Sequence, residues 1–348
     1  FLSIPVLFNY KSLESEIEKK FYSEFKIHLK ILDEISYKVL PRPHLSIKKA
    51  NMRINANNNK SAVVEANNLK IFIHPGNIYF KSNIEIIDLE INESNFKFKI
   101  LDLKDFRNHL YYKVNKPIKI KKSKFFYLDK ENNTILISPI YNLKYSINEK
   151  SKFKQLKIHG NIFDIDYNST WKRYYDNPKN TQNEIKFKNP NFFVKNYFTF
   201  KNSNNFKGSS FINFLNDEII FNYFYNTDKI LINSPNLNNN QKVMIYSNIE
   251  LNPFYFNSQI TFFEKDFNFI IDYIVNHITN INAEFLGNLN GELTLNFKNL
   301  KNQIVEDGKI KLIINEKSIK IIETIFDIKN VGIIKSNFRY FENEGDLI

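Results

Sequence analysis

The chain has 348 residues, of which 43% are hydrophobic and 16% aromatic, so it can bury a sizeable core and is not an intrinsically disordered protein. It has no cysteine, which excludes a disulfide framework and a thiolate zinc site. The net charge is +12, but the lysines are spread along the chain rather than clustered, so we expect no nucleic-acid partner.

The first eight residues form an uncharged apolar segment that ends at Asn9, Tyr10 and Lys11. An aromatic residue beside a lysine is typical of a membrane interface. The segment is far shorter than the roughly 20 residues that a spanning helix needs. We therefore expect residues 1–9 to be the end of a truncated N-terminal membrane anchor, the alternative being a first strand of the sheet. The expected anchor residues are Phe1, Leu2, Ile4, Val6, Leu7 and Phe8.

An amphipathic helix is predicted over residues 12–24. Leu13, Ile17, Phe21 and Phe25 recur at four-residue spacing, and Ser12 is a suitable N-cap. From Phe25 onward the apolar period changes from four to two, which indicates a strand over residues 25–31. The chain therefore begins with a helix that leads directly into β structure.

Most of the remaining sequence predicts strands. Pro41 and Pro43 exclude a helix, and Leu45 and Ile47 then alternate with polar residues. Similar alternation predicts strands at residues 34–40, 63–73, 84–91, 95–100, 118–128, 134–140, 153–167, 184–187, 192–200, 209–215, 218–225, 229–232, 243–251, 254–263, 293–297, 310–314 and 319–321. Residues 171–180 are predicted to form a loop. Two further short helices are predicted over residues 101–114 and 266–278, where apolar residues recur at helical spacing.

These elements predict a mainly β protein. We expect a long antiparallel, curved sheet that forms an open, taco-like groove, because the few helices could not cover one apolar face of so many strands. The expected divisions are the anchor at 1–9, a helix with strands at 10–114, a middle β-groove at 115–263, and a helix with a C-terminal β region at 264–348.

No catalytic motif is present in the sequence. The six histidines have no paired-ligand spacing, and there is no phosphate-binding glycine loop, dinucleotide fingerprint or nucleophile elbow. Asp164 and Asp166 are two residues apart on a predicted strand and could share a face, but without a third ligand a solvated strand face is the better interpretation. We therefore expect no enzyme, no cofactor and no metal site.

The order of the parts resembles a known family. An apolar segment, a helix and a strand pair precede residues 40–47, Leu-Pro-Arg-Pro-His-Leu-Ser-Ile, and a continued β run. This arrangement resembles the N-terminal region of AsmA-like envelope proteins, which are related to the chorein-type bridge-like lipid transfer proteins. Residues 289–295, Leu-Asn-Gly-Glu-Leu-Thr-Leu, resemble the C-terminal β region of that family.

The resemblance implies a bacterial inner-membrane protein with one N-terminal anchor and the bulk of the chain in the periplasm. It implies a role in outer-membrane biogenesis, with phospholipid acyl chains held in an apolar β-groove. The implied partners are phospholipids, the inner membrane, and outer-membrane or other envelope proteins. The alternative is an envelope assembly scaffold of the same fold that carries no lipid. A closed β-sandwich is a further alternative, because alternation alone does not separate a closed core from an open groove.

Apolar residues at alternating strand positions are the expected lining of the groove. They are Phe25, Ile27, Leu29, Leu45, Ile47, Leu69, Ile71, Phe96, Phe98, Leu293, Leu295 and Phe297.

Overall fold

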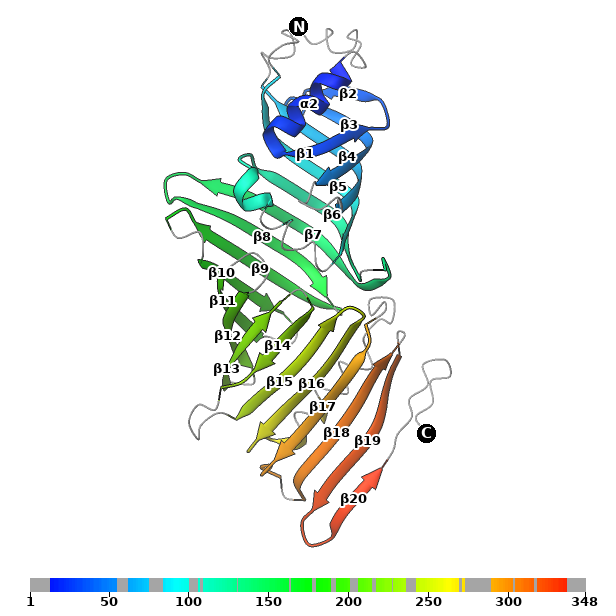
Figure 1. Ribbon diagram of the computed structural model, residues 1–348, viewed down its shortest axis with the longest axis vertical. Coiled ribbons are helices and arrows are strands. Elements are labelled where there is room, and N and C mark those ends of the chain that lie inside the picture. Colours follow the sequence, from blue (N-terminus) through cyan, green and yellow to red (C-terminus); the bar gives the residue numbers. More distant parts are fainter. Residues whose placement is uncertain are drawn as a thin grey trace. The chain divides into compact units, whose positions relative to one another are not determined.

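The computed structural model describes residues 13–54, 62–74, 84–99, 106, 109–129, 131–162, 164–176, 180–188, 192–200, 206–214, 217–226, 228–235, 242–268, 271–272, 289–302, 304–315 and 318–336. Twenty strands in this part of the chain belong to one sheet (Figure 1). The protein is therefore mainly β, as the alternation predicts. Because the strands form a single sheet, the two-sheet sandwich is not supported.

The chain divides into two compact units. The N-terminal unit comprises residues 1–128, 138–161 and 167–178, and the C-terminal unit comprises residues 129–137, 162–166 and 179–348. Each is described separately.

In the N-terminal unit the sheet curves around the helix α2 (Glu14–Phe25), which lies on one of its faces (Figure 1). Ile17, Phe21 and Phe25 are the buried residues of α2, so the predicted four-residue stripe is confirmed. Strands β1 and β2 both pair with β3, and β3, β4 and β5 follow as antiparallel neighbours. The strand bounds are β1 (Ile27–Ile31), β2 (Ile35–Lys38), β3 (His44–Ile54), β4 (Ala62–Ile73), β5 (Ile86–Lys99), β6 (Ile118–Leu128), β7 (Thr134–Asn148), β8 (Phe153–Ile162) and β9 (Ile165–Tyr174).

In the C-terminal unit successive strands pair in chain order from β10 to β20. Their bounds are β10 (Asn180–Phe187), β11 (Phe192–Phe200), β12 (Phe206–Phe214), β13 (Asp217–Tyr225), β14 (Lys229–Asn233), β15 (Val243–Leu251), β16 (Phe254–Phe263), β17 (Gly291–Lys298), β18 (Val305–Asn315), β19 (Ser318–Ile328) and β20 (Gly332–Ser336).

Two neighbouring pairs, β5–β6 and β16–β17, are parallel, so the prediction of a wholly antiparallel sheet was wrong there. Parallel neighbours cannot be joined by a hairpin and need a crossover of a dozen or more residues. The two crossovers are residues 100–117 and 264–290. They contain the segments predicted as the second and third helices.

The described part of the chain contains one α-helix with defined bounds, not the three expected helices. In the first crossover, Phe106 is helical and residues His109–Lys113 form a π-helical turn, η4. In the second, residues 267–268 and 271–272 are helical. The rest of both predicted helices lies outside the described residues.

A β-bulge lies where the prediction left a gap between the strands at residues 84–91 and 95–100. Strand β5 is continuous through this region, and Glu93 takes a positive φ of 52°. The Ser94 hydroxyl donates to the carbonyl oxygen of Asn67 at 3.1 Å and accepts from the Asn67 amide at 2.9 Å. These bonds satisfy the backbone where the register shifts, so one bulged strand replaces the two predicted strands.

The segment after β7 also differs from its prediction. The single strand expected at residues 153–167 is two strands, β8 and β9, joined by a turn in which Asp164 has a φ of 58°. The expected loop at residues 171–180 is wrong at both ends, because Trp171 lies in β9 and Asn180 begins β10. Strand β9 mixes aromatic and polar residues, so its sequence gave no clear strand pattern near its end.

Glycines inside the C-terminal strands make room for aromatic rings. A Cβ atom on Gly291 would lie 2.3 Å from Cδ1 of Phe256, and one on Gly308 would lie 2.7 Å from Cδ1 of Phe326. Both rings come from a neighbouring strand and cover the glycine backbone. The scarce glycines therefore serve close packing on one face of the sheet.

We expect Gly308→Ala to lower the free energy of unfolding by about 1–3 kcal/mol, because the added methyl group would overlap the Phe326 ring. Chemical denaturation measures this change. In a Phe326→Ala background the same substitution should cost much less, since the ring is gone. Equal costs in both backgrounds would show that ring contact does not constrain Gly308.

Candidate functional site

The inner face of the N-terminal unit is the sheet face that α2 covers. Nine of the expected groove residues lie there, and their exposed fractions are between 0% and 7%. Cross-strand pairs such as Leu45 with Ile71 confirm that they share a face. One detail differs: Phe25 is the last residue of α2 and not the first of a strand. The nine residues are Phe25, Ile27, Leu29, Leu45, Ile47, Leu69, Ile71, Phe96 and Phe98.

Elements of the chain itself fill this inner face. The η4 turn packs beside α2, where Nε2 of His109 donates to the carbonyl oxygen of Phe25 at 2.7 Å. Burial lowers the pKa of His109, which favours its neutral form. The Tyr145 hydroxyl donates to the carbonyl oxygen of Leu110 at 2.7 Å and so fixes the crossover against β7. The inner face is therefore a packed core.

One small cavity remains in this core. Its volume is about 30 Å³, and it is lined by apolar side chains that include Ile27, Phe96, Phe106 and Leu110. Ligand pockets usually measure about 300–1,000 Å³. The cavity is therefore an imperfection of packing that is too small for an acyl chain.

The C-terminal unit has one mainly apolar and one more polar sheet face. Residues directly opposite each other in neighbouring strands point to the same side. The register accordingly joins apolar residues into rows across the sheet. These rows are Ile185, Val194, Ile212 and Ile219; Ile230, Ile249 and Phe256; Ile245, Ile260, Leu295 and Ile310; and Leu293, Leu312 and Ile321. We call this side the C-terminal apolar face.

The three remaining expected lining residues lie on the C-terminal apolar face. Leu295 and Phe297 are buried, and Leu293 is half-buried against the same cluster. Phe267, from the second crossover, packs edge-on against Phe297 with ring centroids 5.5 Å apart. These residues belong to a core cluster that also contains Ile219 of β13 and Val243 of β15.

Away from that core the apolar face is less covered. Ile185, Val194, Ile230 and Ile249 are all half-buried in the structure. Sequence reasoning selected none of them, although their strands were predicted. Their alternation was visible, but only the register shows that they continue one apolar surface with Leu293 and Leu295.

The opposite face of the C-terminal unit is more polar, although Phe211, Ile220 and Leu231 also lie on it. A single row crosses nine strands with one residue from each, and its members are exposed or half-buried. Salt bridges such as Lys311 to Glu292, at 2.8 Å, lie on this side. The row consists of Tyr197, Ser209, Asn222, Asn233, Tyr246, Gln259, Thr294, Lys311 and Glu323. This difference in polarity between the two faces is expected of a sheet with one face in water.

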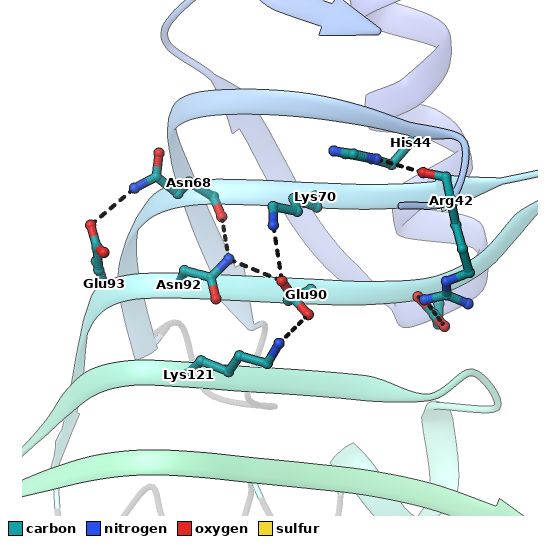
Figure 2. Close-up of polar contacts among 9 residues, drawn as sticks. Arg42, His44, Asn68, Lys70, Glu90, Asn92, Glu93 and Lys121 are labelled. Atoms are coloured by element: carbon teal, nitrogen blue, oxygen red, sulfur yellow. Dashed lines mark hydrogen bonds and ion pairs between the residues drawn. The ribbon is translucent and has the colours of Figure 1, made fainter. Parts of the chain in front are cut away.

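The outer face of the N-terminal unit carries a polar network around Glu90 (Figure 2). The Glu90 carboxylate accepts from Lys121 at 2.8 Å, from Lys70 at 3.2 Å and from the Asn92 amide at 3.3 Å. Burial alone would raise the pKa of Glu90, but the hydrogen bonds from Lys121 and Lys70 outweigh it and lower the pKa to about 2. These bonds tie β4, β5 and β6 together.

A second contact group completes this outer face. Arg42 forms an ion pair with Asp88 at 3.1 Å and stacks over the Phe72 ring at 4.1 Å. His44 donates from Nδ1 to the carbonyl oxygen of Arg42 at 2.7 Å, which holds the segment that precedes β3 (Figure 2). These contacts fix the start of β3 directly after the two prolines. The arrangement stabilises the fold and places no nucleophile beside a base.

The described residues contain no group of three or more metal-ligating side chains placed to hold an ion. Asp164 lies in the turn before β9, whereas Asp166 lies in the strand, so the shared strand face predicted for them was wrong. No helix of the described chain is long and apolar enough to cross a membrane. The expected anchor residues, 1–9, lie outside the described part.

Comparison with known proteins does not identify a family for this chain. No protein-family model matches the sequence, and no curated protein matches it.

We expect Glu90→Gln to be less stable than the parent chain at neutral pH. Because the folded pKa of Glu90 is lowered, its contribution is fully present above the pKa of the unfolded chain, and it is lost as the pH falls from about 4.5 to about 2. It amounts to up to about 3 kcal/mol. Denaturation at a series of pH values should show a difference that closes across this window.

Glu65→Gln is the matched control for this prediction. Glu65 pairs with Lys97 at 3.1 Å on the same two strands as Lys70 and Glu90, but both partners are exposed. Its loss should cost less than about 1 kcal/mol. Equal costs for the two variants would contradict the special role of Glu90.

We also expect Ile27→Lys with Phe98→Lys to unfold the N-terminal unit, because each lysine would be buried without a partner in a packed core. Circular dichroism and denaturation measure the loss. A folded double variant would mean that the inner face can open.

Proposed function

We propose that this protein is a non-enzymatic lipid-binding or lipid-transfer protein of the cell envelope, which holds phospholipid acyl chains against its C-terminal apolar face. The observation that carries the proposal is the two-sided character of the C-terminal sheet. Rows of aliphatic and aromatic residues cross one side, while a row of polar residues crosses the other from β11 to β19.

The energetics of the half-buried residues support this proposal. Leaving an isoleucine half in water forgoes about 1 kcal/mol of burial free energy. A surface built from many such residues gains by being covered. An acyl chain is a suitable cover, since it needs no hydrogen-bond partner and no stereospecific site.

The unit to which we assign acyl-chain binding differs from the sequence expectation. That expectation placed nine of the twelve lining residues in the N-terminal part. In the N-terminal unit α2 and the first crossover already occupy that face. We therefore assign acyl-chain binding to the C-terminal unit, and we assign to the N-terminal unit the role of a closed, stable end.

We further propose that the protein acts at a bacterial inner membrane, with its bulk in the periplasm and a role in outer-membrane biogenesis. The apolar residues 1–8, followed by Tyr10 and Lys11, support attachment to a bilayer. The resemblance of residues 40–47 and 289–295 to AsmA-like envelope proteins supports the rest.

An assembly scaffold without lipid is the second candidate. The packed inner face of the N-terminal unit favours it, because the cavity found among its described residues, of about 30 Å³, is too small for lipid. The two candidates differ in whether the C-terminal apolar face is covered by lipid.

Native mass spectrometry with lipid extraction, on the full chain purified from a bacterial periplasm, tests the proposal. We expect phospholipid to co-purify with the parent chain. Ile230→Lys with Ile249→Glu should abolish this, because the two residues face each other on the apolar side and would present charges to an acyl chain. Opposite charges are used so that the new pair does not repel itself.

Asn233→Lys with Tyr246→Glu is the matched control. These residues form another opposed pair of the same two strands, on the polar side. We expect this variant to keep its lipid. A parent chain that folds and carries no lipid would contradict the proposal and favour the scaffold.

A further inference from the structure

One corner of the C-terminal sheet carries four exposed aliphatic side chains. Ile304, Val331, Ile333 and Ile334 have exposed fractions between 51% and 75%. They belong to two segments: residues 299–304, between β17 and β18, and residues 329–336, which are the turn after β19 and strand β20 (Figure 1). We call these two segments the C-terminal corner.

Hydrogen bonds hold the two segments of the corner together. The amide of Lys329 donates to the carbonyl oxygen of Ile304 at 2.8 Å, and Nζ of Lys329 donates to the carbonyl oxygen of Asn302 at 2.8 Å. Oδ1 of Asn302 accepts from the amides of Ile304 at 2.8 Å and Val305 at 3.0 Å. These bonds fix the backbone of the corner and do not involve its exposed aliphatic side chains.

The aliphatic residues of β20 lie on both faces of the sheet. Ile334 lies opposite Phe326, and Phe326 lies opposite Gly308, so Ile334 extends the C-terminal apolar face. Ile333 lies opposite Asp327 on the other face. A ligand that covers one face would leave one of these two isoleucines in water. A partner that surrounds this end of the strand would cover both.

The charge of the corner is positive. It contains Lys301, Lys329 and Lys335, which are all exposed, and its sequence has no acidic residue. The nearest acidic residues along the chain, Glu306 and Asp327, belong to β18 and β19. The corner is therefore complementary to an anionic surface.

The residue types of the corner favour a bilayer over a protein as its partner. Protein interfaces are enriched in aromatic residues and arginine and depleted of lysine. The corner has neither an aromatic residue nor an arginine. Aliphatic side chains that enter the headgroup layer, beside lysines that extend toward anionic headgroups, are typical of segments that bind at a membrane interface.

We propose that the C-terminal corner binds the surface of an anionic lipid bilayer. Ile304, Val331 and Ile333 enter the headgroup layer, and Lys301 and Lys335 contact lipid phosphates. This contact is separate from the apolar residues 1–8, and it does not depend on the acyl-chain binding that we assign to the C-terminal apolar face.

Flotation of the full chain with lipid vesicles tests the proposal. We expect the parent chain to bind vesicles of equal parts phosphatidylcholine and phosphatidylglycerol, and to bind pure phosphatidylcholine vesicles less tightly. The serine variant, Ile304→Ser with Val331→Ser and Ile333→Ser, should bind the mixed vesicles about tenfold more weakly or worse, because three aliphatic contacts are lost. Lys301→Gln with Lys335→Gln should remove most of the preference for the anionic vesicles.

Matched controls come from the N-terminal unit. Leu32 is 52% exposed, but Asp33 and Glu34 follow it, so Leu32→Ser should bind vesicles as the parent chain does. Lys48→Gln with Lys49→Gln removes the same charge as the lysine variant of the corner, from exposed positions of β3, and should also leave binding unchanged. Every substituted side chain is exposed, so all variants should unfold at the temperature of the parent chain.

Fluorescence locates the contact on the chain. Because the sequence has no cysteine, Val331→Cys and Leu32→Cys each provide a single position for an environment-sensitive dye. We expect the emission at position 331 to shift to shorter wavelength when mixed vesicles are added, and the emission at position 32 to stay the same. Binding through residues 1–8 alone would leave the signal at position 331 unchanged.

Three results would overturn the proposal. One is a parent chain that binds no vesicles, and another is unchanged emission at position 331 on vesicles that do bind the chain. The third is equal vesicle binding by the parent chain and the serine variant. If that variant instead changes the oligomeric state in sedimentation velocity, the corner is a surface for self-association and not for a bilayer.

The lipid proposal for the C-terminal apolar face can be tested separately from the corner. Ile230→Lys with Ile249→Glu should bind vesicles as the parent chain does. The serine variant of the corner should still co-purify with phospholipid in native mass spectrometry. Each proposal can therefore fail while the other stands.

Discussion

A sheet whose strands place most of their aliphatic residues on one side has an apolar side that must be covered. In the C-terminal unit the register keeps these residues in line across successive strands, so single residues add up to a surface. A shift of one residue in any strand would move its isoleucines to the polar side. The aromatic rings over Gly291 and Gly308 belong to the same face, and they make such a shift costly.

The two units meet this constraint differently. The N-terminal unit places α2 and the first crossover on its inner face and binds them with His109, Tyr145 and Lys154. Its outer face is tied by ion pairs around Glu90. The C-terminal unit has a core that draws residues from β13 to β18, while Ile185, Ile230 and Ile249 on the same face are half-buried. The covered face of the N-terminal unit suits stability, whereas the less covered apolar face of the C-terminal unit suits binding.

Much of the fold could be predicted from the sequence, because alternation directly reports which side of a strand is buried. The helix stripe and nearly all strands were predicted correctly, and the twelve expected lining residues do lie on apolar faces. Alternation does not report pairing, so the parallel pairs were missed, although the length of the two segments between the strands could have indicated crossovers.

The errors at single sites have local causes. Asn92, Glu93 and Ser94 have turn-forming side chains, yet Ser94 uses its hydroxyl to stabilise a bulge. The division of residues 153–167 into β8 and β9 was missed, because it depends on a turn at Asp164, a residue that alternation had placed inside a strand. Periodicity also does not show whether other elements of the chain cover an apolar face, because that depends on tertiary contacts.

Photo-crosslinking in cells would test the central claim most directly. A photoreactive phenylalanine analogue can replace Phe221, which lies on the apolar side opposite Ser210, or Tyr246, which lies in the polar row of the same sheet. The account predicts phospholipid adducts at position 221 and none at position 246. Adducts at neither position, or equally at both, would contradict the claim that acyl chains lie on the C-terminal apolar face.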